Sequence, residues 1–245
     1  MNNDWIDIIK YSNIQEKDEL NQWCKYIGYD RYFSIYKLLI DKCEEVSFEM
    51  LKAVAKYEFN LSDYLYSIIK FVELRIRAFL LNQYSFKITK HNYITKISAE
   101  IGEGERDLDS KTHFEYSLDA ETTFTEFIEK SGMDTLFKVV KILSNNELNE
   151  LDLERNDLDK TLKDIKDLRN DVAHGHLLLL KNPNNLKREI ILLLKLLPNS
   201  ELKKKRLFKL KEINNRFEKE LLVNNEAVKE LEIILNEEDK KEIGL

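Results

Sequence analysis

Apolar residues recur every three or four positions along most of this chain, which is the spacing of one helix face. The strongest run covers 61–81, where Ser62 or Asn60 would serve as the N-cap. Similar patterns predict further helices over 13–39 with a break at Gly28, over 48–59, 125–128, 136–143, 158–168 and 186–197, and over the charged tail 201–241. The sequence therefore predicts an all-α fold.

Composition agrees with this pattern. The chain has 245 residues but only 6 Gly and 2 Pro, which argues against a sandwich or barrel with many tight turns. The length suffices for one large domain or two small ones, and no repeat or low-complexity linker demands a second. We expect an N-terminal helical region over 1–45 packed on a helical core over 46–198, followed by charged C-terminal helices over 199–245.

Two local features refine this picture. The aromatic segment Tyr26-Ile27-Gly28-Tyr29-Asp30-Arg31-Tyr32-Phe33 predicts a tight corner between helices, packed with rings. Glu73 and Arg77 lie four positions apart in the strongest helix, which favours an ion pair on one helix face.

The net charge of −6 argues against a generic nucleic-acid coat protein. However, the segment 99–121 alone holds eight acidic and two basic residues, and −8 + 2 = −6 accounts for the whole excess. Gly102 and Gly104 mark its first part, near 99–111, as an acidic loop. The rest of the chain is balanced, so local basic surfaces are compatible with the total.

Location and cofactors are predicted mainly from missing signals. The two cysteines form no CxxC pair, the N-terminus lacks a signal-peptide pattern, and the apolar runs are too short to cross a bilayer. We therefore expect a soluble cytoplasmic protein that makes no membrane contact. His174 and His176 face different sides of a helix and no acidic or cysteine pattern completes a ligand set, so we expect no metal and no cofactor.

The hexamer Arg169-Asn170-Asp171-Val172-Ala173-His174 carries the candidate chemistry, and Gly175 follows it directly. An arginine can neutralise charge that develops on a phosphate, and a histidine can move a proton near neutral pH. Asn170 and His174 are four positions apart and share a helix face. Arg169 is rotated about 140° from His174 on an ideal helix, but its long side chain can fold round the helix end.

Spacing alone makes this a weak motif. Nine arginines and four histidines, with four to six residues allowed between them, give roughly 0.4 chance matches in a chain of this length. Arg106 and His113 also satisfy the spacing, but they lie in the acidic segment, where a phosphate would be repelled. Arg169 and His176 satisfy it too and overlap the better pair. The predicted helix that precedes the hexamer, over 158–168, and the presence of Asn170 distinguish it from these two other pairs.

The hexamer resembles the R-x4-6-H motif of the HEPN superfamily, a group of helical proteins that includes many ribonucleases. The aromatic segment 26–33 and the helix segment 71–77, which holds Glu73, Arg75 and Arg77, are similar to bacterial abortive-infection proteins of the AbiD/AbiF type. Together these segments cover roughly 22–197. The resemblance implies a HEPN-like helical bundle with additional N-terminal helices and a charged C-terminal helical tail.

The resemblance also implies a function. The expected protein is a metal-independent endoribonuclease that acts as a toxin or effector in anti-phage abortive infection. The RNA 2′-hydroxyl would attack the adjacent phosphorus, leaving a 2′,3′-cyclic phosphate. His174 would act as general base or acid, Arg169 would stabilise the phosphorane, and Asn170 would orient the phosphate or the imidazole. One histidine cannot easily serve as both acid and base, so the resemblance implies a homodimer with a composite site.

Other residues are auxiliary candidates. Glu73, Arg77 and Asp171 would line the site or orient Arg169. The basic residues of the tail are either a solvated helix face or a phosphate-contacting surface, and the surface would bind RNA or a regulatory RNA or protein antitoxin. The members of this cluster proposed for RNA binding are Lys203, Lys204, Lys205 and Arg206.

Two alternatives stay open. A non-catalytic module would use Arg169 and His174 to hold RNA or a nucleotide without cutting it. In a purely structural alternative, Arg169 pairs with Asp164 or Glu73, and His174 caps the last helix carbonyls beside Gly175.

Overall fold

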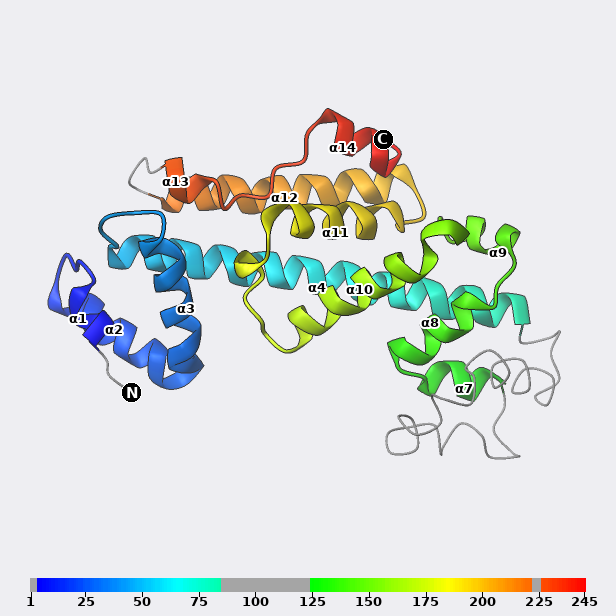
Figure 1. The fold of residues 1–245 in the computed structure, drawn as a ribbon, viewed down its shortest axis with the longest axis horizontal. Helices are drawn as coiled ribbons and strands as arrows, with labels where there is room; N and C mark the ends of the chain where they lie inside the picture. Colours follow the sequence, from blue (N-terminus) through cyan, green and yellow to red (C-terminus); the bar gives the residue numbers. More distant parts are fainter. Residues whose placement is uncertain (1–3, 85–123, 222–225) are drawn as a thin grey trace. The chain divides into compact units, whose positions relative to one another are not determined.

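The computed structural model describes residues 4–84, 124–221 and 226–245 (Figure 1). Within these ranges every secondary-structure element is an α-, 3₁₀- or π-helix. The only β-type pairing there is an isolated parallel bridge between Lys10 and Ser47. The predicted all-α class is confirmed. The acidic segment 99–121, with Arg106 and His113, lies outside the described residues.

Contacts divide the chain into two compact units, each assembled from segments that are distant in sequence. Unit 1 comprises Met1–Tyr66, Asp171–Ile191 and Asn199–Leu245. Unit 2 comprises Ser67–Asn170 and Leu192–Pro198. The division predicted from sequence, at 45/46 and 198/199, stays a prediction.

Unit 1 begins with short helices that meet at the predicted aromatic corner. They are α1 (Asp4–Ile8), α2 (Ile14–Trp23), a π-helical turn η1 (Cys24–Gly28) and α3 (Tyr29–Ile40). The break falls at Gly28, whose φ of 129° suits a glycine. Ring contacts follow on both sides of the break, with Trp23 on Tyr32 at 5.6 Å and Trp5 on Tyr29 at 5.7 Å between centroids. The prediction of a ring-packed corner is confirmed, except at Tyr26, which is 76% exposed.

Helix α4 (Phe48–Tyr84) corrects one prediction. The patterns over 48–59 and 61–81 were expected to form two helices, with Asn60 or Ser62 as an N-cap, but both residues lie inside one continuous helix of 37 residues. Neither residue removes a backbone donor or clashes with the helix as proline does. The buried residue Leu61, 0% exposed, continues the apolar stripe across the expected gap.

The remaining helices of unit 1 come from the C-terminal half of the chain. They include the 3₁₀ turn η4 (Leu178–Leu180), α12 (Ser200–Glu220), α13 (Glu226–Lys229), α14 (Glu237–Ile243) and most of α11 (Pro183–Lys195). The tail predicted as helical over 201–241 is thus divided into three helices. Figure 1 shows α12 running alongside the first part of α4, where Tyr57 stacks on Phe217 with centroids 4.4 Å apart.

Buried polar contacts fix this packing. The Tyr57 hydroxyl donates to Asn214 Oδ1 at 3.0 Å and accepts from the Ile233 backbone N–H at 2.9 Å. Asn214 in turn donates to the Ile233 carbonyl at 3.0 Å. Tyr57 is 1% exposed, so its hydroxyl satisfies groups that water does not reach. These contacts join α4, α12 and the segment that precedes α14.

Unit 2 holds the rest of α4 and the short helices that lead to α10. They are α7 (Phe124–Lys130), α8 (Met133–Lys141), α9 (Asn145–Glu150), the 3₁₀ turn η3 (Arg155–Asp157) and α10 (Leu158–Ala173), of which all but the last residues belong to this unit. Arginine side chains bind the carbonyls at the ends of these elements. Arg75 donates to the carbonyls of Glu150 at 2.8 Å and Leu196 at 2.5 Å, and Arg155 donates to that of Lys141 at 2.7 Å.

Among the described residues, no helix is both long enough and apolar enough to cross a membrane.

Replacing Tyr57 by Phe is expected to destabilise the protein by about 1–3 kcal/mol, because Asn214 and the Ile233 N–H lose a buried partner. Urea unfolding measures the difference. The matched control is Tyr66→Phe, since Tyr66 is 50% exposed on the same helix and its hydroxyl has access to water. Equal stability of the two variants would contradict the structural role of the Tyr57 hydroxyl.

Candidate active site

The candidate hexamer lies at the C-terminal end of α10. Burial of Leu158, Leu162, Ile165 and Leu168 fixes which face of this helix meets the protein. The last helical residue is Ala173, and Gly175 follows in the left-handed conformation with φ 67°. The Gly175 N–H donates to the Val172 carbonyl at 3.3 Å, and the His176 N–H donates to the Asp171 carbonyl at 2.8 Å. This is the Schellman arrangement that ends a helix, and it makes His174 the C-cap residue.

The helix end bears on the structural alternative for His174. Backbone N–H groups already cap the carbonyls of Asp171 and Val172. The exposed His174 side chain is not required for that task, which leaves its ring nitrogens available to another molecule.

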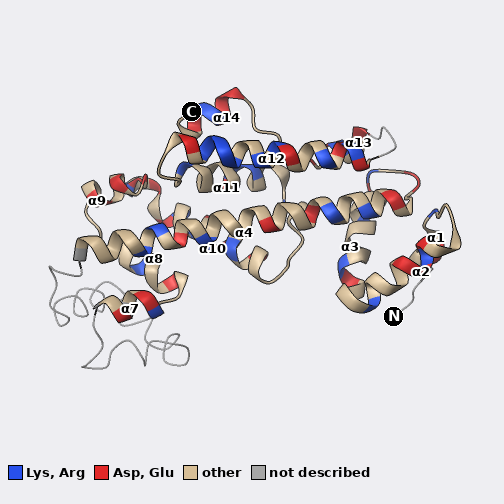
Figure 2. Ribbon diagram, turned by 180° about the vertical axis from the view of Figure 1, so that it is seen from behind, with Lys and Arg blue, Asp and Glu red and all other residues tan. Residues whose placement is uncertain are grey.

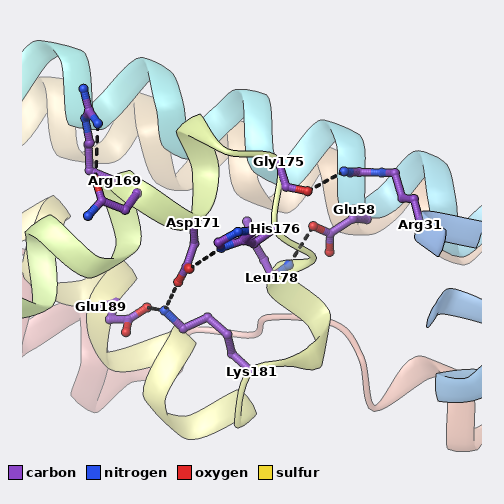
Figure 3. Close-up of polar contacts among 10 residues, drawn as sticks. Arg31, Glu58, Arg169, Asp171, Gly175, His176, Leu178, Lys181 and Glu189 are labelled. Carbon is purple, nitrogen blue, oxygen red and sulfur yellow. Dashed lines mark hydrogen bonds and ion pairs between the residues drawn. The ribbon is translucent and has the colours of Figure 1, made fainter. Parts of the chain in front are cut away.

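Two residues from other helices of unit 1 anchor the segment that follows (Figure 3). Arg31, on α3, donates to the Gly175 carbonyl at 2.8 Å. Glu58, on α4 and 0% exposed, accepts the backbone N–H groups of Leu178 and Leu179 at 2.8 and 3.0 Å. Burial raises the pKa of Glu58, and the two N–H donors oppose that rise. The turn beside His174 is therefore held at both of its ends.

Asp171 is the centre of a second polar cluster in unit 1. Its Oδ2 accepts from Lys181 Nζ at 2.8 Å, and its Oδ1 lies 3.0 Å from His176 Nδ1. Lys181 also pairs with Glu189, whose side chain is 8% exposed, at 2.8 Å. Burial would raise the pKa of Asp171, but the hydrogen bonds from Lys181 and His176 outweigh it and lower the pKa. The auxiliary candidate Asp171 is thus an ionised carboxylate with a fixed orientation.

His174 lies on the wall of a cleft in unit 1 with a volume of about 1090 Å³. Three basic side chains, Arg31, Lys52 and Lys56, also line this cleft. Asp30 and Glu220 also line the cleft, Lys52 pairs with Glu19 at 3.5 Å and Lys56 with Glu220 at 3.4 Å, so most of the positive charge is balanced. The aromatic residues of the lining are Trp23, Tyr29, Tyr32 and Phe59. Rings and cations in one groove are the features that bind single-stranded nucleic acid.

Arg169 and Asn170 belong to unit 2 and are described there by themselves. Arg169 donates to Asn170 Oδ1 at 3.2 Å. Glu73, one of the two partners considered in the structural alternative, pairs with Arg77 instead.

Glu73 and Arg77 form the predicted ion pair, with 2.6 Å between Oε1 and Nη2. Arg77 also donates to the carbonyls of Ile128, Glu129 and Ser131 around the end of α7. These contacts give the pair a structural task within unit 2.

The basic cluster of the tail lies on α12 (Figure 2). Lys203 donates to the Ile243 carbonyl at 2.8 Å and so caps the end of α14. Lys204 and Lys205 are exposed, whereas Arg206 is half-buried. The sequence does not distinguish Lys203 from its neighbours, because its partner is forty residues away.

Comparisons with protein-family models, with curated proteins and with solved structures gave no significant match. The HEPN relationship therefore stays a prediction. Within the described ranges, no group of three or more His, Cys, Asp or Glu side chains is placed to hold a metal ion.

Replacing Gly175 by Ala is expected to destabilise the protein by about 1–2 kcal/mol, because a residue with a Cβ is strained at positive φ. The space itself is open, since the new Cβ would meet Arg31 Nη1 at an ordinary 3.6 Å. The control is Gly132→Ala, at the N-cap of α8 with φ −70° and no atom within 4 Å of the new Cβ. Thermal and urea unfolding compare the two. A cost for Gly132→Ala as large as that for Gly175→Ala would contradict the account.

Proposed function

We propose that this protein is a metal-independent endoribonuclease of the HEPN type that acts as a toxin or effector in bacterial anti-phage abortive infection. One observation carries the proposal. His174, the histidine of the candidate motif, is the C-cap of α10 and lines a cleft that also presents basic and aromatic side chains. A proton-transfer group in such a groove is what RNA cleavage requires.

In the proposed reaction the RNA supplies its own nucleophile. His174 takes the proton from a 2′-hydroxyl, and the 2′-oxygen attacks the adjacent phosphorus. Positioned acid–base groups contribute about 10²–10⁴-fold to such steps. The P–O5′ bond then breaks and the departing 5′-oxygen takes up a proton, which leaves a 2′,3′-cyclic phosphate on one fragment and a 5′-hydroxyl on the other.

Arg169 and Asn170 complete the proposed motif. The guanidinium of Arg169 would neutralise the charge that grows on the phosphorane. Its contact with Asn170 Oδ1 restricts how far the arginine swings, which favours a prearranged cation. Asn170 would then orient either the phosphate or this arginine.

The proposed biological setting is the cytoplasm of a bacterium. The chain contributes one credible motif, so we propose a homodimer that brings two motifs to a composite site. A regulatory RNA or protein antitoxin would hold the enzyme inactive, and the exposed Lys204 and Lys205 of α12 offer it a phosphate-binding surface.

The proposal is tested by producing the wild type, His174→Ala and Arg169→Ala in bacteria and scoring growth arrest. The same purified proteins are then incubated with RNA in EDTA. Each substitution is expected to lower the cleavage rate by about 10²–10⁴-fold and to relieve growth arrest. Arg216→Ala is the matched control, because Arg216 is an exposed arginine outside the motif.

The outcomes separate the alternatives. Equal cleavage by His174→Ala and the wild type would refute the proposed chemistry. A wild type that binds RNA without cutting it, and loses that binding on substitution of Arg169, would select the binding module instead. A wild type that neither cuts nor binds RNA would refute both the ribonuclease and the binding module.

A further inference from the structure

The proposed function leaves one histidine unused. His176 stands two residues beyond His174, and its Nδ1 lies 3.0 Å from Asp171 Oδ1 (Figure 3). A carboxylate only accepts hydrogen bonds, so Nδ1 carries the proton in this contact. The other ring nitrogen, Nε2, is then the one that exchanges a proton with another molecule. The His176 side chain is 64% exposed, so that nitrogen is accessible.

The carboxylate that holds His176 is itself fixed. Asp171 is 27% exposed, and its second oxygen accepts from Lys181, which is anchored in turn by the buried carboxylate of Glu189. A proton-transfer group oriented by a second residue, which a third holds in place, is the arrangement of known catalytic dyads and triads.

His174 and His176 lie close enough to act on one phosphate. Their ring centroids are 6.0 Å apart, and the rings are tilted by 35° to each other. A ring nitrogen must lie about 2.6–3.2 Å from the oxygen whose proton it transfers. Two rings at this separation can therefore reach different oxygens of the same phosphodiester. His174 lines the cleft but His176 does not, so a phosphate that contacts both rings would lie at the cleft edge beside His174.

We propose that His176, oriented by Asp171, is the second catalytic histidine and serves as the general acid. This inference rests on the proposed ribonuclease function. His174 takes the 2′-hydroxyl proton, the 2′-O–P bond forms, the P–O5′ bond breaks, and His176 Nε2 delivers a proton to the departing 5′-oxygen. His174 ends protonated and His176 neutral, and water restores both. Asp171 is a positioning residue that holds the His176 ring through Nδ1.

This pairing changes what the second subunit of the proposed homodimer contributes. Base and acid both come from the segment 171–176 of one chain, so the composite site does not depend on the partner for the second proton transfer.

The test must distinguish an acid from a residue that only completes the helix end. His176→Asn replaces the ring with an amide that still donates to Asp171 but does not titrate. The substrates are a short single-stranded RNA cut by the wild type, and the same RNA with a bridging 5′-sulfur at the scissile linkage. A thiolate leaves without a proton, so a general acid is dispensable for that linkage.

We expect His176→Asn to cut the oxygen substrate about 10²–10⁴-fold more slowly than the wild type and the sulfur substrate within about tenfold of it. His174→Ala is expected to be slow on both. Lys10→Gln, which removes one partner of an exposed ion pair, is the control and is expected to match the wild type. Unfolding midpoints show that each variant is folded.

Several results would overturn this assignment. Normal cleavage of the oxygen substrate by His176→Asn would remove His176 from the reaction while leaving the role of His174 intact. Slow cleavage of both substrates by a folded His176→Asn would show that His176 is not the acid. A wild type inert on all RNA would defeat the proposed function and this inference together.

Discussion

The left-handed turn at Gly175 is the constraint on which the proposed site depends. It ends α10 at Ala173, so that His174 occupies the C-cap position on the cleft wall and does not continue the helical surface. A residue with a Cβ would be strained there by about 1–2 kcal/mol. Arg31 binds the carbonyl of this same glycine, and Glu58 holds the turn that follows. Helix end and anchored turn together fix where His174 stands.

The same helix end also brings a carboxylate and an imidazole into contact. Asp171 lies in the last turn of α10 and His176 just beyond it, and the Schellman turn brings their side chains together. In many helices an apolar contact occupies this place. Here the contact is polar. Asp171 also pairs with Lys181, which pairs in turn with Glu189. The Schellman turn that ends α10 thus also orients the imidazole of His176.

Part of the fold and of the candidate site is predictable from the sequence, for physical reasons. Helix α10, its end near Gly175 and the corner at Gly28 follow from local periodicity and from the conformational freedom of glycine. The union of 48–59 and 61–81 into α4 was missed, because Asn60 and Ser62 are typical cap residues that a long packed helix also tolerates. Arg31 and Glu58 could not be predicted, since 144 and 120 residues separate them from their partners. The sequence presents His176 only as an overlapping match to the motif spacing, and only the fold shows that Asp171 contacts its ring.

In the proposed function, RNA is cut by its own 2′-hydroxyl at a histidine site. The most direct measurement is the chemical nature of the ends, determined by mass spectrometry after the wild type cuts an RNA in EDTA. A matched RNA carries a 2′-O-methyl group at the scissile nucleotide. The account predicts 2′,3′-cyclic phosphate and 5′-hydroxyl ends from the first RNA and no cleavage at the methylated position of the second. Cleavage of the methylated linkage, or ends bearing a 5′-phosphate and a 3′-hydroxyl, would contradict it.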